Sequence, residues 1–131
     1  MKALSIRPEY GMAILNGTKT EEYRTWTTKY RGDLLICNSA KKTRGAVAGH
    51  ALCVAKITGI EERYDGEQKY YAWVIDPFEE GGSYWIDPLK VKGQLKLFNV
   101  GDRLIKPAPF TNPFSKAGEQ WYQEKIAPLI Y

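Results

Sequence analysis

The chain has 131 residues, a formal net charge of +4 and an aromatic content of 13%. This length is sufficient for a single domain, expected to span residues 1–131, with a hydrophobic core, and the aromatic content excludes a disordered chain. Cys37 and Cys53 lie in apolar runs without a Cys or His at metal-ligand spacing. We therefore expect buried thiols rather than a disulfide or a zinc site.

The charge is unevenly distributed. Residues 1–56 carry ten Lys or Arg against four Asp or Glu, whereas residues 57–131 carry nine against eleven. A basic amino-terminal half with interleaved aromatic residues suits a partner that bears phosphate. No apolar run is long enough for a signal peptide or a transmembrane helix, so we expect a cytosolic protein without a membrane partner.

The first half of the chain predicts a helix among strands. Lys2–Arg7 fits a short buried strand, and Pro8–Asn16 fits a short helix that ends before Gly17. The unbroken apolar centre of Asp33–Asn38 is typical of a strand buried on both faces. Ala46–Ile60 predicts a long strand, with small apolar residues at alternate positions from 47 to 57 on one face, as the curvature of a barrel requires.

The second half adds a hairpin and a terminal helix. Glu61–Gln68 is an acidic hairpin segment followed by a strand over Lys69–Ile75, and Phe78–Ser83 predicts a flexible loop. Tyr84–Ile86 is too short for a full strand, and Ser115–Ala127 has helical periodicity. The pattern predicts a mainly β protein with helical caps (α+β), built on a curved or closed β-barrel of about five or six strands.

One segment, Asn16–Gly32 (NGTKTEEYRTWTTKYRG), combines charged, aromatic and threonine residues without any aliphatic side chain. If Thr18–Trp26 is a strand, Glu22, Arg24 and Trp26 share one face, because side chains alternate along a strand. A carboxylate, a guanidinium and an indole in a row can hydrogen-bond, neutralise and stack a planar polar ligand. The alternative interpretation is a solvated edge strand with an Arg–Glu pair.

Two further features have ordinary structural interpretations. The loop Ser39–Gly45 brings Lys41, Lys42 and Arg44 together, which is typical of a solvated turn. The only histidine, His50, is expected to be a hydrogen-bonded structural residue.

The order P-x-Y-x(3)-I-L-x-G-x-K-x-x-E-x-R-x-W-x-T-x-Y-R-G-x-L-L-I, from Pro8 to Ile36, resembles the signature of the ASCH domain, a member of the PUA-like superfamily. Tyr71–Val74 and Pro88–Phe98 are similar to the second and third blocks of the family. The chain is also similar to the ASCH region of the activating signal cointegrator proteins. The resemblance implies a PUA-like β-barrel, a basic cleft beside the first helix and second strand, and RNA or nucleotide binding.

Carried over by the resemblance, the cleft residues fall on Lys19, Glu22, Arg24, Trp26 and Arg31. Lys19 and Arg24 suit phosphate, and Arg24 also suits a base edge. Glu22 can accept a hydrogen bond from an exocyclic amine. Trp26 could stack a base or pack as a core aromatic residue.

Two enzymatic branches of the family offer an alternative. One resembles an N4-acetylcytidine amidohydrolase that uses a lysine and a threonine three residues later; Lys19 keeps the lysine, but Glu22 replaces the threonine. The other looks like a ribonuclease, for which Lys19, Tyr23, Lys29 and Tyr30 supply acid–base groups in principle.

The sequence therefore predicts an RNA- or nucleotide-binding protein whose basic cleft accepts a single-stranded or flipped-out nucleotide, without a cofactor or metal. The alternative is a hydrolase acting on RNA or a modified nucleoside, with Lys19 and Glu22 as catalytic candidates. A third possibility is a protein-interaction module that uses the aromatic region Tyr70–Trp85. The predicted ligand-binding residues are Lys19, Glu22, Arg24, Trp26, Lys29, Tyr30 and Arg31.

Overall fold

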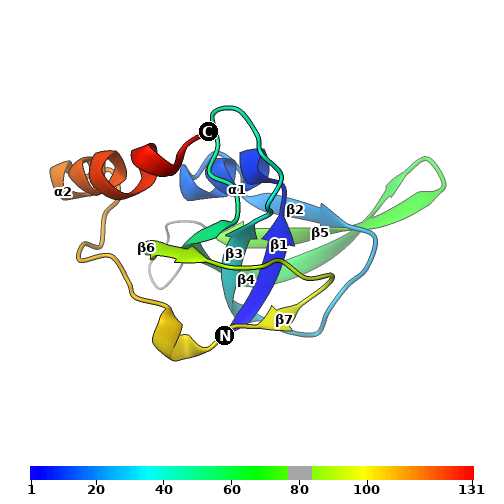
Figure 1. Ribbon diagram of the computed structural model, residues 1–131. Coiled ribbons are helices and arrows are strands. Elements are labelled where there is room, and N and C mark those ends of the chain that lie inside the picture. Colours follow the sequence, from blue (N-terminus) through cyan, green and yellow to red (C-terminus); the bar gives the residue numbers. More distant parts are fainter. Residues whose placement is uncertain (77–83) are drawn as a thin grey trace.

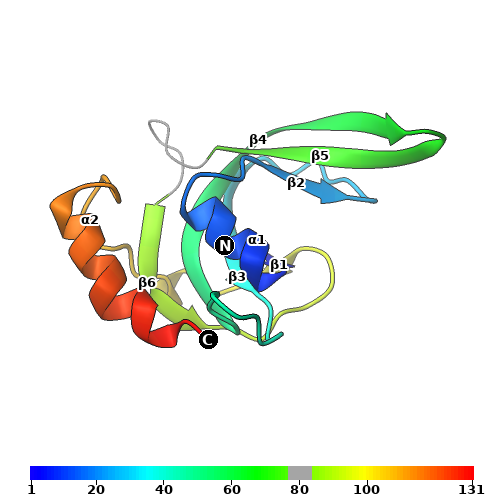
Figure 2. The same ribbon diagram turned by 90° about the horizontal axis from the view of Figure 1, so that it is seen from above.

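The computed structural model describes residues 1–76 and 84–131, and the predicted loop Phe78–Ser83 lies outside these residues. The described strands form one curved sheet that surrounds helix α1 on its concave side (Figures 1 and 2). The strands are β1 (Lys2–Ile6), β2 (Glu21–Arg24), β3 (Gly32–Asn38), β4 (His50–Asp65), β5 (Gln68–Asp76), β6 (Tyr84–Lys90) and β7 (Phe98–Asn99). The helical elements are α1 (Pro8–Leu15), the 3₁₀ turn η1 (Asp102–Leu104), α2 (Lys116–Trp121), the π-helical η2 (Tyr122–Ile126) and the 3₁₀ turn η3 (Ala127–Leu129).

The strand order in the sheet is β2-β5-β4-β3-β1-β7, and β6 pairs with β4 beside this path. β1 and β3 are parallel, and the other pairs are antiparallel. The connection between the parallel strands contains α1 and β2. α1 packs against the sheet through its apolar face.

Alternation along the central strands sorts the core into two clusters, one on each face of the sheet. The cluster on the side of α1 contains Leu4, Ile6, Leu34 and Ile36 together with Met12, Ile14 and Leu15 of the helix. The opposite cluster contains Ala3, Leu35 and Cys37 and is covered by Ile86 and Phe98. The prediction that residues 33–38 form a strand buried on both faces is confirmed.

β4 departs from the predicted regular alternation. It begins at His50 and ends at Asp65, and its pairing with β6 shifts register between Ala51 and Cys53. Ala51 therefore belongs to the outer cluster, whereas Cys53 belongs to the cluster around α1. An extra residue in one strand reverses the faces of those that follow, so the predicted uniform small face over residues 47–57 is wrong.

β6 is longer than the sequence suggested. It runs from Tyr84 to Lys90, through Asp87 and Pro88, so the prediction that this segment is too short for a full strand is wrong. The register shift lies at this point, because Trp85 pairs with Cys53 and Leu89 with Ala51. Pro88 cannot donate to a ladder, and the interruption of pairing accommodates it.

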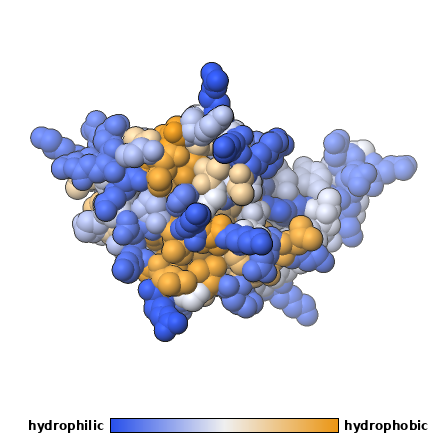
Figure 3. All heavy atoms as spheres, viewed as in Figure 1, coloured by the Kyte–Doolittle hydropathy of each residue, from blue (hydrophilic) through white to orange (hydrophobic). Residues whose placement is uncertain are grey.

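Among the described strands, the sheet is open rather than closed into a barrel, because no backbone pairing joins β2 to β7 or to β1. The prediction of a mainly β fold with helical elements is confirmed, but the strands number seven rather than five or six. The β4–β5 hairpin extends beyond the body and is covered by hydrophilic side chains, while apolar surface gathers over the body (Figures 1 and 3).

Candidate functional site

The first turn of α1 is held close to the end of β3 by a glycine. A Cβ atom on Gly11 would lie 1.7 Å from the Oδ1 atom of Asn38, so only glycine permits this approach. Asn38 is buried, and its Nδ2 atom donates to the carbonyl oxygen of Val47 at 2.9 Å. This packing places Arg7 and Tyr10 beside the carboxyl end of β1.

β2 begins after a tight turn at the end of α1. Gly17 has a φ of 78°, the left-handed conformation expected after a helix, and the backbone amides of Thr18 and Lys19 donate to the carbonyl oxygen of Ala13. β2 then pairs with β5, with Glu22 opposite Trp73. The period of two buries Glu22 and leaves Tyr23 exposed.

A hollow of about 350 Å³ lies between β2 and the carboxyl end of β1, at the opening of the curved sheet. Its lining comes from four elements that are distant in sequence: the end of β1, the start of α1, β2, and the residue after β3. The lining residues are Ser5, Ile6, Arg7, Tyr10, Glu22, Tyr23, Arg24 and Ser39.

Glu22 is the buried carboxylate of this hollow, with only 5% of its surface exposed. The Nζ atom of Lys19 lies 3.9 Å from its Oε1 atom, and the Nη2 atom of Arg24 lies 3.5 Å from its Oε2 atom. The backbone amide of Tyr23 donates to Oε1 at 2.9 Å. A buried carboxylate needs such partners, and the two cations and the amide hold it in place.

Arg24 connects the two sides of the opening. Its Nη2 atom donates to the carbonyl oxygen of Ser5 in β1 at 2.9 Å, and its side chain remains 24% exposed. Its Nε atom is buried and has no hydrogen-bond partner among the described residues. A side chain thus bridges β2 and β1 where the backbone ladder does not.

Two tyrosine rings flank Lys19. Its Nζ atom lies 5.0 Å from the ring centroid of Tyr10 and 4.9 Å from that of Tyr23, both within cation–π range. The two tyrosines are 43% and 52% exposed. An ammonium group and two partly exposed tyrosine rings therefore lie together beside the buried carboxylate.

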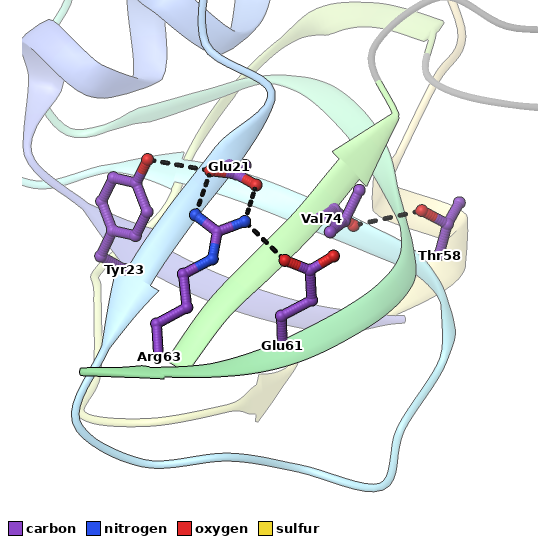
Figure 4. Close-up of polar contacts among 6 residues, drawn as sticks. All are labelled: Glu21, Tyr23, Thr58, Glu61, Arg63 and Val74. Carbon is purple, nitrogen blue, oxygen red and sulfur yellow. Dashed lines mark hydrogen bonds and ion pairs between the residues drawn. The ribbon is translucent and has the colours of Figure 1, made fainter. Parts of the chain in front are cut away.

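A surface network fixes one of these rings. Arg63 donates to both carboxylate oxygens of Glu21 and to Glu61, and the hydroxyl of Tyr23 donates to Glu21 at 3.0 Å (Figure 4). The hydrogen bonds from Arg63 and then from Tyr23 lower the pKa of Glu21. The hydrogen bond to Glu21 raises the pKa of Tyr23. The network ties β2 to β4 across β5 and orients Tyr23.

The structure brings Lys19 and Arg24 to Glu22 but places Trp26 elsewhere. Lys19 lies beside the hollow and is not one of its lining residues. The ring of Trp26 packs edge-to-face on Trp73, with centroids 4.9 Å apart, against the core cluster around α1. Because β2 ends at Arg24, strict alternation does not carry Trp26 into the hollow.

The remaining predicted site residues, Lys29, Tyr30 and Arg31, also lie outside the lining of the hollow. The hydroxyl of Tyr30 donates to the carbonyl oxygen of Asp33, and the Nη1 atom of Arg31 donates to the carbonyl oxygens of Thr28 and Tyr30. Lys29 is exposed. These residues order the segment that leads from β2 to β3.

Four residues of the hollow were not among the site residues predicted from the sequence: Ser5, Arg7, Tyr10 and Ser39. The tyrosine of the P-x-Y motif was the one signal that pointed to Tyr10. The other three reach the hollow only because the sheet brings the ends of β1 and β3 together.

The expected structural roles of Cys37, Cys53 and His50 are confirmed. Both thiols are free and buried, and burial raises the pKa of each to about 12. The Nδ1 atom of His50 lies 2.8 Å from the carbonyl oxygen of Ala48. Among residues 1–76 and 84–131, no group of acidic, Cys or His side chains could hold a metal ion. The helices of this part of the chain are also too short or too polar to cross a membrane.

The model of the ASCH domain matches residues 4–127. No curated protein matches the chain in sequence. Among solved structures, an ASCH protein from Zymomonas mobilis is similar at 15% identity and a TM-score of 0.57, over 78% of this chain and 88% of that one. A tyrosine-to-phenylalanine variant from the same organism is similar at 13% identity and a TM-score of 0.57, over 94% and 96% of the two chains. A serine-to-alanine variant is similar at 14% identity and a TM-score of 0.55, over 94% of each chain.

Proposed function

Because the chain belongs to the ASCH domain family, we propose that it binds RNA and accepts one single-stranded or flipped-out nucleotide in the hollow between β2 and β1. The observation that carries this proposal is the buried carboxylate of Glu22 between Lys19 and Arg24, beside two exposed tyrosine rings. This arrangement offers a partner to each chemical part of a nucleotide.

Each group has a defined task in this proposal. The Glu22 carboxylate accepts hydrogen bonds from the exocyclic amine of the base. Lys19 and Arg7 attract the phosphate of the nucleotide. Tyr10 and Tyr23 take over the stacking role first considered for Trp26, since their rings are accessible. Stacking on an aromatic ring contributes about 1–3 kcal/mol per base in single-stranded complexes. Arg24 holds the two sides of the hollow apart at a fixed width and presents its exposed part to the ligand.

The hydrolase alternative is favoured by one observation, the closeness of Lys19 to Glu22 and to the Tyr10 and Tyr23 rings. A lysine, a carboxylate and phenols are suitable groups for proton transfer. Glu22 itself carries no hydroxyl nucleophile at the position where the amidohydrolase branch has threonine.

The binding proposal is tested by fluorescence anisotropy with a labelled single-stranded RNA at several salt concentrations. Lys19→Ala should weaken binding and reduce the slope of log affinity against log salt by about 0.7, the value for one lost phosphate contact on a single strand. Lys116→Ala, a surface change of the same charge in α2, is the matched control. Equal affinities and slopes for the two variants would remove Lys19 from the binding site.

Catalysis is separated from binding by following the same RNA on a denaturing gel after incubation with the protein. The proposal expects intact RNA. Cleavage that is lost in Lys19→Ala and retained in Lys116→Ala would make the hydrolase the correct function.

A further inference from the structure

A basic loop adjoins the hollow. Ser39, which lines the hollow, begins the loop 39–45, and its backbone amide donates to the carbonyl oxygen of Ile6 at 2.8 Å. The loop passes beside α1 in both ribbon views (Figures 1 and 2). It carries three exposed cations, Lys41, Lys42 and Arg44.

The loop is held by its own contacts. The hydroxyl of Thr43 donates to the carbonyl oxygen of Lys41 at 3.0 Å, and the backbone amide of Gly45 donates to the carbonyl oxygen of Tyr131 at 2.9 Å. The Nζ atom of Lys42 lies 5.9 Å from the ring centroid of Tyr131. The backbone that carries the three cations therefore has a defined place relative to the hollow before any ligand arrives.

The charged side chains of this loop form no ion pair in the part of the chain that the structure describes. None of the ion pairs among the described residues includes Lys41, Lys42 or Arg44. Arg63, by contrast, is paired with two glutamates on the face drawn in Figure 4. Three uncompensated cations within four residues attract a polyanion far more than a small neutral ligand.

The loop also lies at the right range for neighbouring phosphates. Lys41 is the second residue after Ser39 and Arg44 is the fifth. Their Cα atoms therefore lie at most about 8 Å and about 19 Å from that of Ser39. The loop is therefore close enough to the hollow for the phosphates next to a bound nucleotide to reach it.

We infer that the ligand of the hollow is one nucleotide of a longer single strand, and that Lys41, Lys42 and Arg44 bind the phosphates next to it. This inference rests on the proposed function. It distinguishes a polynucleotide from a free nucleotide or nucleoside, because a single nucleotide seated in the hollow gains nothing from the loop.

The experiment compares an eight-nucleotide single-stranded RNA with a mononucleotide. The test variant is Lys41→Ala/Lys42→Ala/Arg44→Ala. Its control, Arg103→Ala/Lys106→Ala/Lys116→Ala, also removes three exposed cations, at η1, the segment after it and α2. Near-ultraviolet circular dichroism establishes that each variant is folded.

We expect the eight-nucleotide RNA to bind the native protein more tightly than the mononucleotide does. The test variant should lower the salt slope for this RNA by about 2, since three contacts at about 0.7 each are removed. Between 50 and 200 mM salt, the affinity gap between native protein and test variant should then shrink about 18-fold. Mononucleotide binding should be unchanged, and the control variant should keep the native slope.

The possible failures are distinct. If Lys19→Ala weakens binding of the eight-nucleotide RNA but the test variant matches its control, the loop is not a phosphate site and only this inference falls. If the RNA binds equally well to the native protein and to Lys19→Ala, both the proposed function and this inference are wrong. If polyglutamate binds the loop as tightly as RNA does, the partner is an acidic protein segment and the inference is wrong.

Discussion

Replacement of Gly11 by alanine tests the packing that positions the site. Alanine normally stabilises a helix interior by about 1 kcal/mol relative to glycine. Here the new Cβ atom would stand 1.7 Å from Oδ1 of Asn38, although real Cβ contacts are essentially never under 3.0 Å, so helix and amide must separate by at least 1.3 Å. Overpacking of this kind costs about 1–3 kcal/mol, and losing the buried bond from Asn38 to Val47 costs about 1–3 kcal/mol more.

The net expectation for Gly11→Ala is therefore a loss of about 1–5 kcal/mol in the free energy of unfolding, opposite in sign to the helix propensity. Urea unfolding followed by tryptophan fluorescence measures it. Gly59→Ala is the matched control, because a Cβ atom at Gly59 meets nothing within 4 Å, and it should change stability by less than about 1 kcal/mol.

Coupling to Asn38 gives the sharper test. In Gly11→Ala/Asn38→Ala the added methyl group has room, so the double variant should lose less stability than the two single variants together. A Gly11→Ala protein as stable as the native one would refute the close approach and, with it, the argument for how Arg7 and Tyr10 reach the hollow.

Two predictions concern titrating groups. Burial raises the pKa of Cys37 and Cys53 from 9.0 to about 12, so both thiols should resist a disulfide reagent at pH 8 until the protein unfolds. Between pH 9 and pH 12 the unfolded chain binds fewer protons than the folded protein, so the free energy of unfolding should fall by about 1.4 kcal/mol per pH unit for each thiol. Cys53→Ala should halve this dependence of stability on pH. An unchanged pH dependence in Cys53→Ala would contradict the raised pKa of Cys53. Arg63→Gln should return the lowered pKa of Glu21 toward 4.5, as an NMR titration would detect. The stability contributed by the Arg63–Glu21 pair is present above pH 4.5 and is lost as the pH falls through the lowered pKa of Glu21. The free energy of unfolding of Arg63→Gln should therefore decrease less steeply at acidic pH than that of the native protein. An unchanged Glu21 titration in this variant would show that Arg63 does not cause the lowered pKa.

Local signals were sufficient for much of the fold. Pro8 and Gly17 mark the ends of α1, and the apolar run of β3 marks its burial on both faces, because these signals depend only on neighbouring residues. The shift between Ala51 and Cys53, and the continuation of β6 through Pro88, arise from pairing between distant strands and leave no local pattern.

Some residues of the candidate site could be grouped from the sequence, and others only from the fold. Lys19, Glu22 and Arg24 lie close in sequence, so one alternating segment was enough to group them. Tyr10 and Ser39 belong to other elements, and only the topology of the sheet adds them. Whether these residues bind RNA remains a prediction for the experiments above.

The unpaired opening between β1 and β2 explains why there is room for a ligand at all. Backbones of hydrogen-bonded neighbouring strands lie about 4.8 Å apart, a spacing that leaves no volume between them. β7 pairs with β1 only at Lys2 and Ala3, so the carboxyl-terminal half of β1 keeps a free edge, which Arg24 reaches with a long side chain. The width of the hollow is therefore set by the length of one side chain rather than by strand number. Substitutions at this single position would alter the width of the hollow while every backbone ladder of the sheet stays intact.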